Sequence, residues 1–136
     1  MSEEVFSELG IFSQTLTPDQ VNSILGIKCD KSYLIGDLRE HTIIREKKNG
    51  WIVRSRLPRS FALEEHVADV LTRVSPAIDK IRHMAEQADV AVQFGCVIYT
   101  RQRPALNFSK EVVATICSLG ASIDIDLYLL PEEDED

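Results

Sequence analysis

The sequence has little cysteine and no long apolar segment, and both shortages exclude whole classes of protein. Its 136 residues include three cysteines, Cys29, Cys96 and Cys117, an odd number without a C-x-x-C spacing. A disulfide framework and a thiolate zinc site are therefore not indicated, and we expect free thiols. No run of about 18 apolar residues is long enough to cross a membrane, and the acidic start Met-Ser-Glu-Glu differs from the basic start of a signal peptide. We therefore expect a soluble, cytoplasmic protein.

Positive charge is also scarce. The formal net charge of −7 argues against general nucleic-acid binding, because affinity for phosphate groups depends on lysine and arginine. The charge is segregated along the chain: seven of the fifteen basic residues lie between Arg39 and Arg59, whereas residues 132–136 are all acidic. This acidic end follows Pro131 and has no apolar side chain to bury. We therefore predict that residues 131–136 form a disordered tail.

Recognisable catalytic and cofactor-binding motifs are missing as well. The chain has no glycine-rich phosphate loop, no nucleophile elbow and no redox pair of cysteines. Its three histidines, His41, His66 and His83, do not follow the H-x-x-x-H or H-E-x-x-H spacing of a metal site. Cys96 has no basic neighbour in sequence to activate it, so we interpret it as a buried apolar residue. The sequence predicts neither a metal nor a cofactor.

Two similar stretches stand out among what the sequence does contain. In residues 17–27 and again in residues 109–121, a capped amphipathic segment runs into Leu-Gly and then into an apolar segment. Each stretch has the signature of a helix followed by a strand. With 44% hydrophobic residues, a chain of this length can bury one core of ordinary size. We therefore predict one domain over residues 1–130, made of two βαβ-like halves.

A hairpin is the sharpest local prediction in the middle of the chain. Asn49-Gly50 is a strong turn signal, because both residues tolerate a positive φ angle. Residues 41–46 and 51–56 are therefore predicted to pair as the two arms of this hairpin. In the second arm, Trp51 and Val53 share a face and are expected to point into the core.

Local signals predict the other elements. Thr17 and Gln20 form a capping box that starts a helix over residues 18–25, and Gly26 suits its end. Apolar periodicity gives strands over 5–12, 90–99 and 122–129, and helices over 61–74, over 76–87 and from the cap Ser109 onward. The strand over 90–99 is apolar on both faces, as a central strand is, whereas 122–129 alternates and has one wet face. The sum is an α+β fold with an antiparallel or mixed sheet of about five or six strands and helices mainly on one face.

The order and spacing of these pieces resemble a known family. The similarity lies in residues 51–55 (Trp-Ile-Val-Arg-Ser), 63–67 (Leu-Glu-Glu-His-Val), the Ser75-Pro76 junction, the strand around Cys96 and the closing residues 123–128. On these residues the chain resembles the bacterial family called domain of unknown function 4279. The resemblance implies a small, stand-alone bacterial protein with no established activity, catalytic residues or cofactor. By analogy, such a protein can be an immunity protein or an inhibitor of a partner.

The arginines after the predicted hairpin turn form the leading candidate site. Arg54 and Arg56 share one strand face and Arg59 follows, so several planar donors are available to carboxylates or phosphates. Acidic residues of the same chain, including Asp124 and Asp126, are an alternative partner for these arginines, and such surface ion pairs contribute little. Our leading hypothesis is a non-enzymatic protein-binding module that holds an acidic partner surface through the three arginines.

A second candidate site uses residues that only folding would bring together. His66 lies at the border of the apolar face of the helix predicted over 61–74, where its polar tip needs a partner. Asp124 and Asp126 project from one face of the final strand, about 7 Å apart. Together the three would suit a small enzyme or ligand-binding domain. The sequence leaves this alternative open, as it does a homodimer formed through the exposed face of the final strand.

Overall fold

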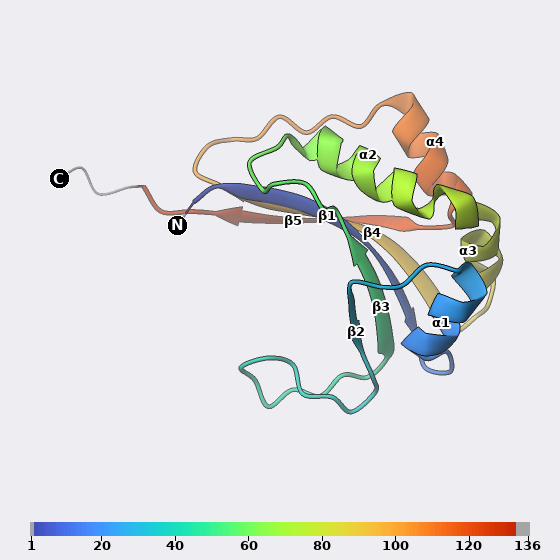
Figure 1. The fold of residues 1–136 in the computed structure, drawn as a ribbon. Helices are drawn as coiled ribbons and strands as arrows, with labels where there is room; N and C mark the ends of the chain where they lie inside the picture. Colours follow the sequence, from blue (N-terminus) through green and yellow to red (C-terminus); the bar gives the residue numbers. More distant parts are fainter. Residues whose placement is uncertain (1, 133–136) are drawn as a thin grey trace.

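A five-stranded sheet with helices against one of its faces forms the body of the molecule (Figure 1). The computed structural model describes residues 2–132, so most of the predicted acidic tail, residues 133–136, lies outside the described residues. The strands are β1 (Glu4–Ser13), β2 (Lys31–Tyr33), β3 (Asn49–Arg54), β4 (Val90–Thr100) and β5 (Ser122–Leu129). The helices are α1 (Pro18–Leu25), α2 (Leu63–Val74), the 3₁₀ turn η1 (Ser75–Ala77), α3 (Ile78–Ala85) and α4 (Lys110–Ser118).

The strand order is β2-β3-β1-β4-β5, and the sheet is mixed. All neighbours are antiparallel except β4 and β5, which run parallel. The segment β4-α4-β5 is therefore a βαβ unit of adjacent strands. The strands β1 and β2 are both antiparallel to β3, which lies between them, so β1-α1-β2 is a βαβ-like unit split by a third strand. The predicted α+β fold, with a mixed sheet covered on one face, is confirmed.

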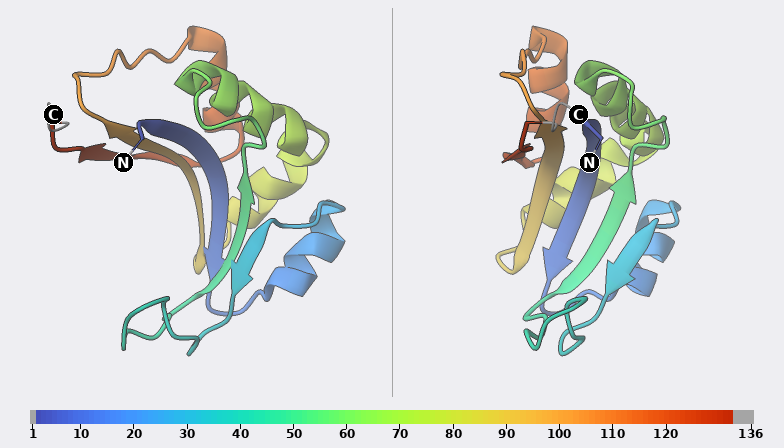
Figure 2. Two further views of the ribbon diagram at one scale, coloured as in Figure 1. Left: turned by 60° about the vertical axis from the view of Figure 1, so that its left-hand side comes forward. Right: turned by 90° about the vertical axis from the view of Figure 1, so that its left-hand side faces the viewer.

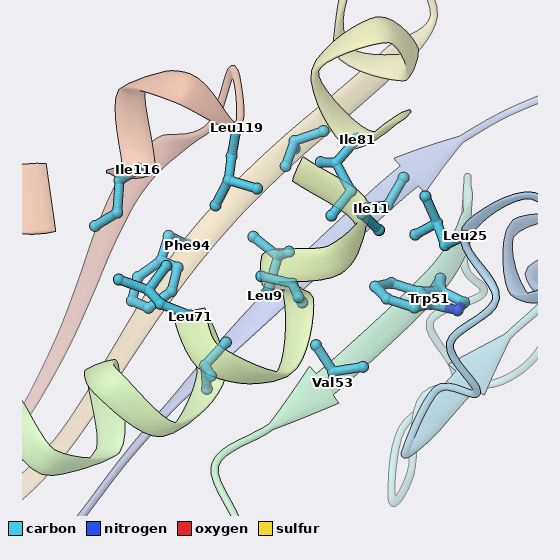
Figure 3. Packing of buried hydrophobic residues seen from close by; sticks show 14 of the residues in the cluster. Leu9, Ile11, Leu25, Trp51, Val53, Leu71, Ile81, Phe94, Ile116 and Leu119 are labelled. Atoms are coloured by element: carbon cyan, nitrogen blue, oxygen red, sulfur yellow. The ribbon is translucent and has the colours of Figure 1, made fainter. Parts of the chain in front are cut away.

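The core lies between the sheet and the helices (Figure 3). Trp51 and Val53 point into it with 1% and 0% of their surface exposed, as predicted from the alternation of β3. The indole N–H of Trp51 donates to Oδ1 of Asn22 on α1 at 2.7 Å, which satisfies the one polar atom of this side chain. The same cluster includes Leu9, Ile11, Leu71, Ile81, Phe94, Ile116 and Leu119.

The first helix forms as its capping residues predict. The backbone N–H of Gln20 donates to Oγ1 of Thr17 at 3.3 Å, and the Gln20 side chain accepts from the backbone N–H of Thr17 at 2.9 Å. Gly26 ends α1 with a φ of 68°, a conformation that costs glycine little. Reciprocal capping of this kind is complete within the local sequence, so the helix bounds follow from it.

The predicted hairpin with a turn at Asn49-Gly50 is wrong. Residues 41–46 form no strand, and Asn49 and Gly50 are instead the first residues of β3, which pairs with β1 and β2. The amide of Asn49 accepts from the backbone N–H of Ile35 and donates to the carbonyl of Leu16. Two distant segments therefore use the polar side chain that the turn would have used, and the chain before β3 stays a loop.

Gly50 serves a close approach rather than a turn. It lies opposite Tyr33 of β2, and a Cβ atom at Gly50 would lie 2.3 Å from Cζ of the Tyr33 ring. The ring packs over the glycine as aromatic side chains do when they cover a bare backbone in a sheet. The contact between Tyr33 and Gly50 thus holds the short edge strand β2 against β3.

We expect Gly50→Ala to lower the free energy of unfolding by about 1 to 2 kcal/mol, because the new methyl group displaces the Tyr33 ring. Urea denaturation measures the change. In a Tyr33→Ala background the same substitution should cost much less, since the obstructing ring is gone. An equal cost in both backgrounds would contradict the contact.

Candidate functional site

In the described part of the chain, one face of the sheet carries no helix, and this face is concave. The views in Figure 2 show the strands bending away from the helices, so that the free face lies on the inner side of the bend. Because side chains alternate along a strand, the residues between the buried positions point to this face. Among them are Phe6 and Glu8 of β1, Arg54 of β3 and Tyr99 of β4. This concave face is left free of helices and is open to a partner.

Two arginines converge on one aromatic ring on the concave face. The guanidinium carbon of Arg59 lies 3.9 Å from the centre of the Phe6 ring, and that of Arg54 lies 5.3 Å from it. Arg54 also donates through Nε to Oε2 of Glu8 at 2.7 Å, directly across the β1–β3 pair. Within residues 2–132, the guanidinium of Arg59 forms no ion pair. Arg59 is therefore positioned by stacking and keeps its donors available.

The Phe6 ring and the two arginines lie in an open hollow of about 630 Å³, which we call the Phe6 hollow. It is lined by Ser2, Glu4, Phe6, Arg54, Arg59 and Tyr99. The backbone N–H of Val5 donates to the carbonyl of Arg59 at 3.1 Å and ties the loop after β3 to β1. On the other side, the Tyr99 ring stacks on Tyr128 of β5 at 4.7 Å between centroids. Backbone pairing and ring stacking thus hold both walls of the hollow.

Arg56 belongs to a different group of charges. Its Nη2 donates to Oδ1 of Asp30 at 3.1 Å, and Arg73 of α2 binds the same carboxylate. Burial alone would raise the pKa of Asp30, but hydrogen bonds from Arg73, from the backbone N–H of Arg54 and from Arg56 together lower it to about 2. The structure therefore brings Arg54 and Arg59 together and directs Arg56 elsewhere. Acidic residues of the chain do pair with Arg54 and Arg56, and they are Glu8 and Asp30 rather than the aspartates of β5.

His66 lies on the helix side of the sheet, fully buried. Its Nδ1 is 2.7 Å from Oγ of Ser55, which also accepts from the backbone N–H of Ser7 at 3.1 Å. Burial lowers the pKa of His66, because a charged imidazole would lose its hydration. The neutral ring thus links α2 to Ser55, which follows β3, and Ser55 in turn binds β1.

The structure does not bring His66 together with Asp124 and Asp126. The two aspartates lie on β5 opposite Gly95 and Val97, and these positions alternate with Phe94, Cys96 and Ile98, which point into the core on the helix side. They therefore face the concave side of the sheet and are exposed, whereas His66 is sealed on the other side. A site that uses all three would have to cross the sheet.

Metal ligands and a reactive thiol are not assembled in the described part of the chain. No group of three or more histidine, cysteine, aspartate or glutamate side chains is placed there to hold a metal ion. Cys96 is fully buried, and burial raises the pKa of its thiol to about 11, so the thiolate that attacks substrates is suppressed. The helices of this part are also too short or too polar to span a membrane.

Sequence reasoning missed Phe6 and Tyr99. Alternation along residues 4–13 and 90–100 places both on the face opposite the buried positions, and that signal was present in the sequence. Their meeting with Arg59 was not, because it depends on how the loop after β3 returns to β1.

A family model described as a domain of unknown function (DUF4279) matches residues 3–130. No curated protein and no solved structure matches the chain significantly.

Because the pKa of Asp30 is low, the stability of the protein should vary with pH in the acid range. The pKa of an aspartate in the unfolded chain is about 3.9, whereas the pKa of folded Asp30 is about 2. The charged carboxylate therefore stabilises the fold above about pH 4, and this stabilisation is lost as the pH falls toward 2. We expect Asp30→Asn to lower the free energy of unfolding by about 1 to 2 kcal/mol at pH 7, after screening by solvent. Urea denaturation at several pH values should show the difference from wild type shrinking between pH 4 and 2. A constant difference would contradict the assignment.

His66 should also make stability fall as the pH falls, but in a less acidic range than Asp30 does. An unfolded histidine takes up a proton near pH 6.5, whereas buried His66 resists it, so the wild-type protein should lose stability as the pH falls below about 6.5. We expect His66→Gln to flatten the melting temperature between pH 7 and 5, measured by calorimetry. His83→Gln, at an exposed site on α3, should keep the wild-type slope. The same slope in all three proteins would count against a buried neutral His66.

Proposed function

This chain belongs to the DUF4279 family, a domain of unknown function, and we propose that it is a non-enzymatic protein-binding module. The observation that carries the proposal is Arg59, whose guanidinium is held over the Phe6 ring with no ion-pair partner among the described residues. An arginine fixed in this way loses little conformational freedom when it binds a carboxylate. The proposed partner is a protein that presents an acidic segment to the concave face.

The Phe6 hollow offers the other features of a protein interface. Phe6 and Tyr99 provide flat apolar surface beside the charged donors, a combination that is enriched where proteins bind one another. Arg54 is already paired with Glu8, so it would bind a carboxylate of the partner either together with Glu8 or in place of it. Charge-assisted hydrogen bonds to Arg59 would then orient the partner, and the two rings would exclude water from them.

The chemistry of the hollow favours binding over catalysis. Its ionisable groups are the two arginines, Glu4 and Tyr99, which hold and orient charged groups but do not form a nucleophile with an adjacent base. The buried Ser55–His66 pair resembles such a set, but it lies behind the sheet without access to solvent. In this proposal the module works in the bacterial cytoplasm, and an immunity-like or inhibitory action is the form of binding that analogy with such families offers.

We expect reversal of both charges, Arg54→Glu with Arg59→Glu, to weaken partner binding by about a hundredfold or more, since truncating hydrogen-bonded interface charges costs several kcal/mol. The partner is first identified by co-purification with the tagged chain from its native cells. Affinity of the purified pair is then measured by calorimetry at low and at high salt. Wild-type binding should weaken as salt rises.

Two matched variants locate the effect. Lys80→Glu reverses one charge on the helix side of the sheet, where Lys80 is exposed on α3, and should bind like wild type. Arg56→Glu tests the arginine that the structure places with Asp30, and a smaller loss is expected there. Wild-type affinity in a folded Arg54→Glu, Arg59→Glu protein would reject the Phe6 hollow as the binding surface.

A further inference from the structure

The strand β5 forms one edge of the sheet, and its outer side has no neighbouring strand among the described residues. All eight of its residues, Ser122–Leu129, are exposed, although only one wet face was expected from the sequence. An edge of this length presents a row of unpaired backbone N–H and C=O groups. Natural edges of this kind are usually shortened, covered, broken or protected by charge, and β5 has only charge, in Asp124 and Asp126.

The two faces of β5 differ sharply. Ile123, Ile125 and Leu127 pair in register with the buried residues of β4, yet each keeps 39% to 45% of its surface exposed. On the other face, Asp124 and Asp126 form no ion pair within residues 2–132. The strand thus presents an apolar row toward the helix side and an acidic row toward the concave side.

We propose that β5 accepts an extended segment of a partner as a sixth strand, and that this segment alternates apolar residues with lysine or arginine. Backbone hydrogen bonds would supply affinity, as in other cases where a peptide extends a sheet. Cross-strand pairs would supply specificity, because basic residues would lie opposite Asp124 and Asp126 and apolar ones opposite Ile123, Ile125 and Leu127. This site is the outer edge of β5, which meets the Phe6 hollow only through the stacking of Tyr128 on Tyr99, and it does not depend on the function proposed for the hollow.

A second copy of the chain fits this edge poorly. Two copies related by a two-fold axis through the sheet would pair antiparallel, with each face of one strand meeting the same face of the other. Centred on Ile125, that pairing sets Asp124 opposite Asp126 of the copy, and centred on Asp126 it sets this residue opposite itself. Like charges directly opposite each other are destabilising. Centred on Leu127, it leaves Ile123 opposite Pro131, which follows the strand.

The chain itself supplies the probe for a test. The variant Asp124→Lys, Asp126→Lys keeps the apolar row and replaces the acidic row by a basic one, so it presents the proposed strand. We expect each protein alone to be monomeric, because its own charges oppose self-pairing. An equimolar mixture with wild type should form a one-to-one heterodimer in sedimentation velocity at low salt, and hydrogen exchange should slow in residues 122–129 of both chains.

Two controls separate this pairing from general attraction. Glu40→Lys with Glu86→Lys makes the same change in net charge at exposed sites away from β5, and it should not associate with wild type. Adding Ile125→Lys to the β5 variant should abolish the heterodimer by placing a charge in the apolar row. The absence of a heterodimer between folded proteins, or protection outside β5, would overturn the proposal. A wild-type dimer through β5 would also overturn it and assign the edge to a second copy.

Discussion

The alternation of side chains along β1 is the constraint on which the rest of the structure depends. This strand lies in the middle of the sheet, with ten residues paired to β4 and six to β3. Its odd-numbered residues, such as Leu9 and Ile11, must be buried, and the helices cover that face. Its even-numbered residues, such as Phe6 and Glu8, are thereby directed to the concave face. Core and candidate site are two sides of one strand.

The sequence predicted best those features that are complete within a few residues. The capping box of Thr17 and Gln20 and the inward faces of Trp51 and Val53 depend on local bonding and period, and they were predicted correctly. The Asn49-Gly50 turn failed because tertiary contacts competed for the same residues: Asn49 bonds to two distant backbone segments, and Gly50 makes room for Tyr33. A strong local signal lost to long-range packing.

The candidate site shows the same division. That Arg54 and Arg59 would be near each other follows from sequence separation, but their shared contact with Phe6 joins segments about fifty residues apart. The separation of Arg56 from them also depends on distant residues, since Asp30 and Arg73 come from two other parts of the chain. The cluster of arginines in the sequence indicated a binding surface, but only the fold shows that Arg54 and Arg59 lie together and that Arg56 pairs with Asp30 instead.

Asp30 links the two faces of the sheet. One carboxylate receives the backbone N–H at the end of β3, the side chain of Arg56 and the side chain of Arg73 from α2. The position of Arg54 on the concave face is therefore coupled to the docking of a helix on the opposite face. A fragment that contains the strands alone would lack the ion pair between Arg73 and Asp30, and the end of β3 that carries Arg54 would be held less firmly. The surface that would meet a partner thus depends, through Asp30, on the helix layer behind the sheet.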